Sequence, residues 1–320
     1  MITDLHAHYH PRAYIEAIQA LADVRRGGAM APHADTDTDE HLAARLEHMD
    51  QAGVGLQVLS PAAGRSPYSG DEAASVAAAR LCNDQHAELV AHRPDRFKAF
   101  VTLPLPHVDA SLRELERGLD ELGMIGLNLH ISALDRSVAE DEFLAIYEEM
   151  NRRGGLIFYH PCGDGIRSPM INDYRLGAAV GTSLEDASIA LHLIAKRIPD
   201  RFPNITHVIP HLGGPIPMLL NRLDRQFSME QFELPEPPSV TARRFYYDTV
   251  GHGSHAALRC AVEAFGADHV LPGSDYPVLL SWESYARTFD WIREVDLPDG
   301  AADQILERTA LEVLARAGVA

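Results

Sequence analysis

Metal-binding side chains alternate near the start of the chain, where residues 4–11 read DLHAHYHP. In a β-strand every second side chain points to the same face, so Asp4, His6, His8 and His10 are predicted to share one face. Four such polar groups are costly inside a core unless something binds them. Two interpretations follow: an exposed strand end rich in histidine, or two metal ligands with an aspartate behind them.

Residues of the same chemistry recur at the ends of short apolar runs further along the chain. The candidates at or just after the run ends are His6, His8, His130, His160, His211, His252 and Asp275. In a parallel α/β barrel the carboxyl ends of the strands converge on one pocket. A histidine-rich pocket without metal remains the alternative, but the common placement of these residues favours a metal site.

A catalytic divalent ion needs three or four nitrogen and oxygen ligands and one open position. The imidazoles of His6, His8 and His160 and the carboxylate of Asp275 supply that set. Asp275 also supplies a base that can take a proton or return one to carbon. Asp4, two residues before His6, is predicted to accept a hydrogen bond behind the ligands.

Eight short apolar runs alternate with longer amphipathic segments, and this alternation has to position the candidates. The runs are 1–8, 54–60, 97–103, 124–130, 155–160, 205–211, 245–250 and 269–275. The predicted helices include 72–93, 108–122, 140–153, 184–199, 254–265, 281–294 and 303–317. The pattern predicts an α/β fold, a single (β/α)8 TIM-type barrel over residues 1–320. An open doubly wound sheet is the alternative, but no glycine-rich turn follows the first run.

Three segments depart from the alternation. Residues 24–40 are predicted to be a long loop after the first strand, and residues 161–182 a non-helical stretch covering the same end of the barrel. Residues 229–244 are proline-rich and are predicted to lie at the opposite face.

Charge and composition exclude several classes of partner. The net charge of −18 opposes binding to nucleic acid and to anionic membranes, which need a basic surface. No apolar run approaches the roughly 20 residues of a membrane span, and no signal peptide is recognisable. The cysteines Cys82, Cys162 and Cys260 are widely spaced, which predicts reduced thiols in a cytoplasmic protein.

Four motifs in order, DLHAHYHP, FYHP, VIPHLGGPIP and LPGSDYP, resemble those of the amidohydrolase superfamily. They are most similar to the branch of aminocarboxymuconate-semialdehyde decarboxylase and related metal-dependent aromatic-acid decarboxylases. The resemblance implies that His6, His8, His160 and Asp275 bind one divalent ion, with zinc expected and manganese as the alternative. One ion is expected because no lysine ends the fourth or fifth run. The resemblance also implies that His211 acts on water or on the substrate.

Substrate contacts and assembly are further expectations. Arg222 matches an arginine that in the decarboxylase reaches the pocket of the neighbouring subunit, which implies a homodimer and a small carboxylate substrate. His130 and His252 are predicted to line the pocket and to contact substrate. The decarboxylase carries another carboxylate-binding arginine after its first strand, and here only Arg25 and Arg26 are candidates.

The leading expectation is a metal-dependent, non-oxidative decarboxylase of a small aromatic or dienoic carboxylic acid. Hydrolysis of an ester, lactone, amide or C–C bond in the same site is the first alternative, and hydration is the second. A metal- or ligand-binding barrel without catalytic activity is the alternative from a different class.

Overall fold

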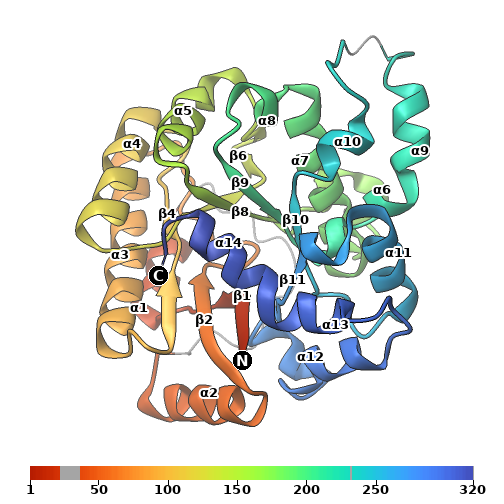
Figure 1. Cartoon of the computed structure of the whole chain (residues 1–320). Helices are drawn as coiled ribbons and strands as arrows, with labels where there is room; N and C mark the ends of the chain where they lie inside the picture. Colours follow the sequence, from red (N-terminus) through yellow and green to blue (C-terminus); the bar gives the residue numbers. More distant parts are fainter. Residues whose placement is uncertain (22–36, 231–232, 320) are drawn as a thin grey trace.

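Parallel strands form a closed barrel in the computed structural model, which describes residues 1–21, 37–230 and 233–319 (Figure 1). The barrel strands are β1 (Ile2–His8), β2 (Val54–Ser60), β3 (Phe97–Ala99), β4 (Val101–Thr102), β5 (Leu127–His130), β8 (Leu156–His160), β9 (Thr206–Ile209), β10 (Tyr246–Asp248) and β11 (Val270–Leu271). They are hydrogen-bonded in the orders β1-β2-β3 and β11-β10-β9-β8-β5-β4, and all of these pairs are parallel.

Two backbone seams join the sheets into one barrel. β3 and β4 are halves of one strand position, because Phe100 N donates to Leu59 O at 3.0 Å on one side while Val101 N donates to Gly126 O at 2.8 Å on the other. Between β11 and β1, Asp275 N donates to His6 O at 2.8 Å. The predicted (β/α)8 barrel is therefore confirmed.

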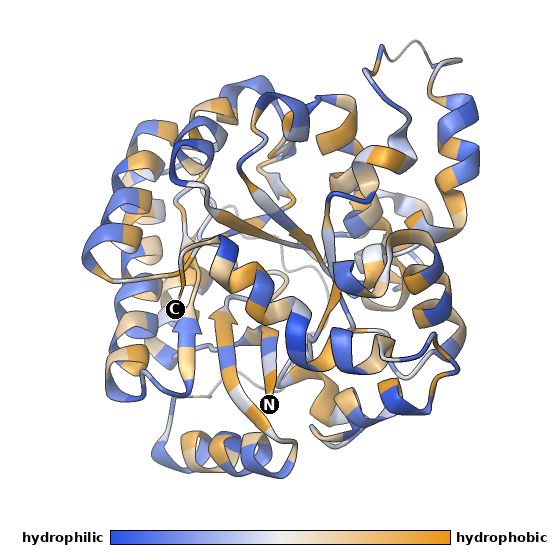
Figure 2. Ribbon diagram, viewed as in Figure 1, coloured by the Kyte–Doolittle hydropathy of each residue, from blue (hydrophilic) through white to orange (hydrophobic). Residues whose placement is uncertain are grey.

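Helices surround the strands on the outside of the barrel (Figure 1). They are α1 (Arg12–Gln19), α2 (Asp39–Gln51), α3 (Glu72–His92), α4 (Val108–Glu116), α5 (Leu144–Arg153), α6 (Pro169–Asn172), α7 (Thr182–Ala195), α8 (Ile198–Arg201), α9 (Ile216–Gln226), α10 (Pro238–Ala242), α11 (His255–Phe265), α12 (Arg287–Asp290), α13 (Ala301–Asp303) and α14 (Ala310–Arg316). Figure 2 shows hydrophobic residues concentrated on the strands and on one side of the surrounding helices, as expected for a layer that covers a barrel.

Side-chain caps fix where several helices begin. Thr38, Asp71 and Ser254 accept hydrogen bonds from backbone N–H groups in the first turns of α2, α3 and α11. Such caps satisfy N–H groups that have no partner within the helix. Gly154 ends α5 in the left-handed conformation, at φ 63°, which glycine adopts without strain.

An apolar cluster fills the interior of the barrel, and α14 lies across one end of it (Figure 1). The buried members of the cluster are Leu5, Val58, Phe100, Ile125, Leu156, Phe158, Val208, Tyr246, Leu271, Ala310, Val313 and Leu314. The strands supply most of these side chains, and the last three come from α14. Because this filling closes one end, polar chemistry is confined to the other, where the strands reach their carboxyl ends.

The structure corrects several predicted boundaries. Residues 281–294 are not one helix, because a 3-10 turn ends at Ser281, α12 begins only at Arg287, and a second 3-10 turn, Trp291–Glu294, follows it. The segment 161–182 contains α6 and a π-helical turn at 177–181, so it is partly helical. Similarly, α10 lies within 229–244.

The loop predicted for residues 24–40 is shorter at its end, since α2 begins at Asp39. Residues 22–36, which include Arg25 and Arg26, lie outside the described residues. A small antiparallel pair that was not predicted, β6 (Ser132–Ala133) with β7 (Arg136–Ser137), follows β5.

In the described part of the chain, no helix combines the length and apolarity that crossing a membrane requires. Cys82, Cys162 and Cys260 are free thiols. Burial raises the pKa of the Cys162 thiol to about 12, which removes the thiolate that a nucleophilic cysteine needs.

Candidate metal and active site

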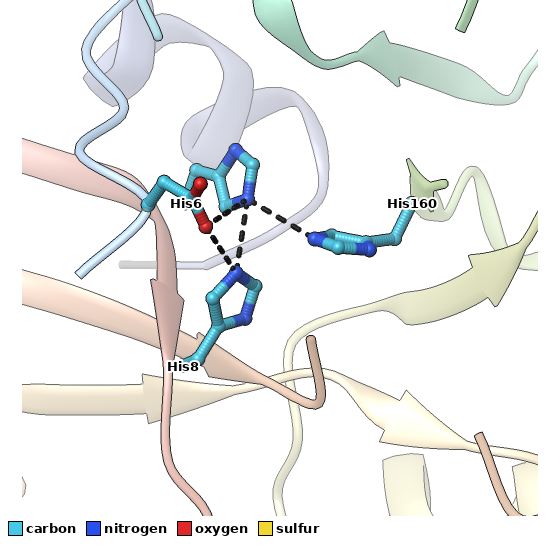
Figure 3. A group of neighbouring side chains, drawn as sticks. His6, His8 and His160 are labelled. Atoms are coloured by element: carbon cyan, nitrogen blue, oxygen red, sulfur yellow. Dashed lines mark hydrogen bonds and ion pairs between the residues drawn. The ribbon is translucent and has the colours of Figure 1, made fainter. Parts of the chain in front are cut away.

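Three imidazoles and one carboxylate converge at the carboxyl ends of β1, β8 and β11. His6, His8, His160 and Asp275 each offer a ligand atom, and these atoms lie within 4.8 Å of one another. Nε2 of His6 lies 3.1 Å from Nε2 of His8 and 3.2 Å from Nε2 of His160. Figure 3 shows the three rings pointing toward one another, those of His6 and His8 from β1 and that of His160 from β8. The residues that the sequence singles out as a ligand set are thus brought together.

In each of the three histidines the ring nitrogen that faces away from the cluster, Nδ1, has a hydrogen-bond partner. The three contacts are His6 Nδ1 with Asp248 Oδ2 at 2.7 Å, His8 Nδ1 with Ser60 O at 3.1 Å, and His160 Nδ1 with Pro161 O at 2.9 Å. Carbonyl and carboxylate oxygens accept hydrogen bonds, which assigns the proton of each neutral ring to Nδ1. Burial lowers the pKa of His8, and it lowers the pKa of His160 well below its ordinary value, so neither ring gains a second proton readily.

The consequence is an electron-rich centre. Three Nε2 lone pairs face one another, and Asp275 adds a negative charge, with its Oδ1 2.9 Å from His8 Nε2. Burial alone would raise the pKa of Asp275, but the hydrogen bond with His8 and the neighbouring rings of His6 and His211 lower it to about 2. Mutual repulsion of these donors is relieved by a cation at their centre. The donor set therefore fits a divalent metal ion.

Asp248, at the end of β10, is a site residue that the sequence reasoning missed. Its Oδ2 accepts from His6 Nδ1, while its Oδ1 accepts from His211 N at 2.9 Å and from Val250 N at 3.0 Å. One buried carboxylate therefore orients a candidate ligand and the backbone of a candidate catalytic residue. An aspartate inside the apolar run FYYDTV was the available signal.

His211 lies beside the ligand cluster, with its ring centroid 5.4 Å from that of His6. Its Nδ1 is 2.9 Å from Oδ2 of Asp186, a fully buried carboxylate on α7. Although burial by itself lowers the pKa of His211, the neighbouring Asp186, Asp248 and Asp275 raise it to about 10. His211 is thereby held with Nδ1 occupied and Nε2 available to a reacting group.

The turn after β9 is packed tightly enough to fix this geometry. His211 itself has φ 52°, and Gly214 has φ 56°. A Cβ placed on Gly214 would lie 2.1 Å from the carbonyl oxygen of Ser183, which is on α7. Only glycine permits this approach of the turn to α7, and the approach brings Asp186 within reach of His211.

Asp4 does not bond to a ligand ring. It accepts from Ser274 Oγ at 2.5 Å and from Tyr285 OH at 2.6 Å, and its remaining contacts are to the backbone of His6 and Ser274 and to Gln57. The register of β1 against β2 shifts between Asp4 and Ala7. The strict alternation predicted for this strand is therefore interrupted, and Asp4 anchors the strand backbone rather than an imidazole.

The three residues predicted to contact substrate differ in their exposure and in their distance from the ligand cluster. His130 is buried beside the cluster, its ring 5.4 Å from that of His160, and its Nε2 bonds to Ala62 O at 3.0 Å. His252 is exposed and lies against Trp282, with ring centroids 5.8 Å apart. Arg222 is exposed on α9. Of these residues, only His130 borders the cluster within this chain.

A single carboxylate organises the loop that follows β8. Glu185, on α7, accepts from four backbone N–H groups, those of Cys162, Gly163, Gly165 and Ile166, at 2.5–3.4 Å. Its side chain is fully buried. The loop that carries the backbone onward from His160 is thus held by an internal carboxyl group, whose pKa burial raises to about 7.

Comparison with known proteins places this geometry in a family. The amidohydrolase family model matches residues 3–316. The 6-methylsalicylic acid decarboxylase of Penicillium expansum is 25% identical over 98% of this chain and 96% of its own length. The 2-amino-3-carboxymuconate-6-semialdehyde decarboxylase of Dictyostelium discoideum is 25% identical over 84% of this chain and 75% of its own length.

A solved structure has the same fold. The dihydroxybenzoic acid decarboxylase of Polaromonas sp. JS666, with bound manganese and the inhibitor 2-nitroresorcinol, superposes with a TM-score of 0.82 at 22% identity, covering 98% of this chain and 96% of that one. The resemblance to the decarboxylase branch seen in the sequence motifs is confirmed by these relatives. The chain belongs to the amidohydrolase family.

Proposed function

We propose that this protein is a metal-dependent enzyme that removes CO2 from a small aromatic or dienoic carboxylic acid without oxidation. The observation that carries the proposal is the convergence of three Nε2 atoms and the Asp275 carboxylate beside His211. The two curated relatives, each 25% identical, are decarboxylases and support this reaction class over hydrolysis or hydration.

The four converging residues, His6, His8, His160 and Asp275, would hold one divalent ion. When bound, the ion supplies a Lewis acid that binds and polarises substrate oxygens. We propose zinc, because imidazole-rich sites of this kind suit it. The decarboxylase structure with manganese makes that ion the alternative to be tested.

His211 and Asp275 would handle the proton. Loss of CO2 leaves the electron pair of the broken C–C bond on a substrate carbon, and that carbon must take a proton. His211 suits the acid role, since Asp186 occupies its Nδ1 and Nε2 remains to deliver the proton. Asp275 is ionised at neutral pH. Its free oxygen can therefore act as a base that takes up a proton and returns it to carbon.

The test of the reaction is an incubation of the metal-loaded protein with hydroxybenzoates, 6-methylsalicylate, carboxymuconates and lactones. CO2 release and ring absorbance are measured separately. We expect one equivalent of CO2 for each acid consumed. Turnover of a lactone without CO2 would replace the proposal with a hydrolase, and turnover of no compound would contradict it.

The test of the metal site is elemental analysis of purified protein, with His160→Ala as the variant. We expect one zinc ion per chain in the wild type and loss of that ion in the variant, with the barrel still folded by circular dichroism. His92→Ala, at the exposed end of α3, is the control. Full metal occupancy in His160→Ala would refute the ligand assignment.

We also propose a homodimer in which Arg222 enters the pocket of the partner subunit. Within the described residues Arg222 makes no hydrogen bond or ion pair, so its guanidinium remains available. Met218, one turn earlier on α9, is 76% exposed and extends the same surface. Leu220, two residues before Arg222, is buried in this chain's own core and does not belong to that surface.

A further inference from the structure

Two arginines are buried in the described part of the chain, Arg45 at 1% exposure and Arg65 at 7%. A buried cation is costly unless its charge and its donors are matched. Arg45 meets this requirement. Its Nη1 donates to Gln57 Oε1 at 3.0 Å, its Nη2 donates to His8 O at 2.6 Å, and its guanidinium lies over the ring of Tyr276 at 4.4 Å.

Arg65 has no such compensation. Across residues 1–21, 37–230 and 233–319, no hydrogen bond or ion pair involves its guanidinium. Burial lowers the pKa of Arg65, which reflects the loss of water around the charge. A guanidinium nevertheless stays protonated in proteins, and it offers five N–H donors in a planar fork. Arg65 is therefore a largely buried cation whose donors are free to receive an anion.

The backbone around Arg65 is part of the wall of the metal site. Ala62 N donates to His10 Nε2 at 3.0 Å, and Ala62 O accepts from His130 Nε2 and from Arg65 N, both at 3.0 Å. The ring of His10 stacks on that of His8 with centroids 5.8 Å apart. The loop after β2 is thus tied on two sides to histidines that border the ligand cluster.

Two further contacts hold the loop in place. Tyr14 OH, on α1, donates to Arg65 O at 2.5 Å. A Cβ placed on Gly163, in the loop after β8, would lie 3.2 Å from the Cβ of Ala63. The backbone that carries Arg65 is consequently fixed at the carboxyl end of the barrel.

We propose that Arg65 binds the carboxylate of the substrate, acting from the same chain as the metal ligands. This inference rests on the proposed decarboxylase function, which requires an anionic substrate. In a chain of net charge −18, such a substrate needs a local cation. The planar guanidinium of an arginine can donate hydrogen bonds to both oxygens of a carboxylate. The substrate carboxylate also supplies the negative charge that Arg65 does not meet among the described residues.

The test compares ligands that differ by a carboxylate alone. The pairs are 2,6-dihydroxybenzoate with resorcinol and 6-methylsalicylate with 3-methylphenol, titrated calorimetrically into metal-loaded protein. Arg65→Met is expected to weaken binding of the acid by about 10- to 100-fold and to leave binding of the phenol unchanged, because a charge-assisted bond is lost. With a turned-over acid, KM rises by the same factor while kcat changes little.

Two further variants complete the design. Arg65→Lys keeps the charge but loses the planar guanidinium, and its affinity for the acid is expected to lie between those of the wild type and Arg65→Met. This variant keeps the proposal testable if Arg65→Met does not fold. Arg113→Met, 70% exposed on α4, is the control with wild-type binding. Equal weakening of acid and phenol, or no weakening of the acid, overturns the role of Arg65 alone. A wild-type protein that binds neither acid and releases no CO2 overturns the proposed function as well.

Discussion

Asp248, at the end of β10, and His6, on β1, form a fully buried pair, with Oδ2 of Asp248 2.7 Å from Nδ1 of His6. The carboxylate fixes the tautomer of His6 and turns its Nε2 toward His8 and His160. The other oxygen of Asp248 accepts from the backbone of His211. The candidate metal ligand His6 and the candidate proton donor His211 are therefore both held by Asp248.

Asp248→Asn is expected to weaken metal binding by about 10- to 100-fold, because an amide cannot match the carboxylate in holding the His6 ring. Competition with a chromophoric chelator measures this affinity directly. Asp268→Asn, an exposed change after α11, is the control. An unchanged metal affinity in Asp248→Asn would show that His6 is oriented by other contacts.

Asp275→Asn is expected to retain part of the metal and to lose nearly all turnover, because an amide cannot take up and return a proton. Metal content and kcat are measured on the same preparation, so that loss of the ion is separated from loss of chemistry. Asp290→Asn, exposed at the end of α12, controls for the charge change. A variant with near wild-type kcat would place the base elsewhere.

Arg222→Ala is expected to raise KM and lower kcat while metal content stays intact. Mixing it with Asp275→Asn protein should restore part of the activity, since one pocket of a mixed dimer keeps both groups. Subunit exchange is verified by native mass spectrometry. Mixed dimers that form but stay inactive, or a protein that is monomeric at assay concentrations, would contradict the role in the partner subunit.

Stability should fall in mild acid because of His207, on β9. Burial lowers its pKa to about 3, so between pH 6.5 and 3 the unfolded chain binds the proton more readily than the folded one. The contribution of the neutral ring is complete above pH 6.5 and is lost as the pH falls toward 3.

His207→Phe removes this proton uptake. The variant loses the hydrogen bond between Tyr159 OH and His207 Nδ1, so it is expected to be less stable at pH 7.5. Its decrease in unfolding free energy from pH 7.5 to pH 5 should be smaller than that of the wild type by about 2 kcal/mol. Urea denaturation at the two pH values measures both. Equal decreases would assign the acid sensitivity to other groups.

The barrel could be predicted because alternating apolar runs and amphipathic segments leave few other parallel folds. The ligand cluster could be predicted for the same reason, since barrel topology alone brings the ends of β1, β8 and β11 together. Asp186 could not, because an acidic residue on an amphipathic helix looks the same whether it faces water or a histidine. Asp186 is fully buried only because the turn at Gly214 packs on α7.

Arg65 escaped the sequence reasoning for a related reason. It lies in a loop of small residues, AAGRSPYSG, which carries no periodicity to mark its burial. Its enclosure arises from tertiary contacts with Tyr14 and with the histidines that border the cluster. The helix predicted over 281–294 was wrong because the chain leaves the helical conformation between Ser281, where a 3-10 turn ends, and Arg287, where α12 begins.

The four N–H groups that converge on Glu185 form the type of backbone cradle that grips phosphate in nucleotide-binding proteins. Here the cradle is filled permanently from within. A phosphate ester would have to expel a buried carboxylate to bind there, and the released loop would lose its order beside His160. The order of the loop beside His160 is thus supplied by α7 itself, independently of any residue that contacts the substrate.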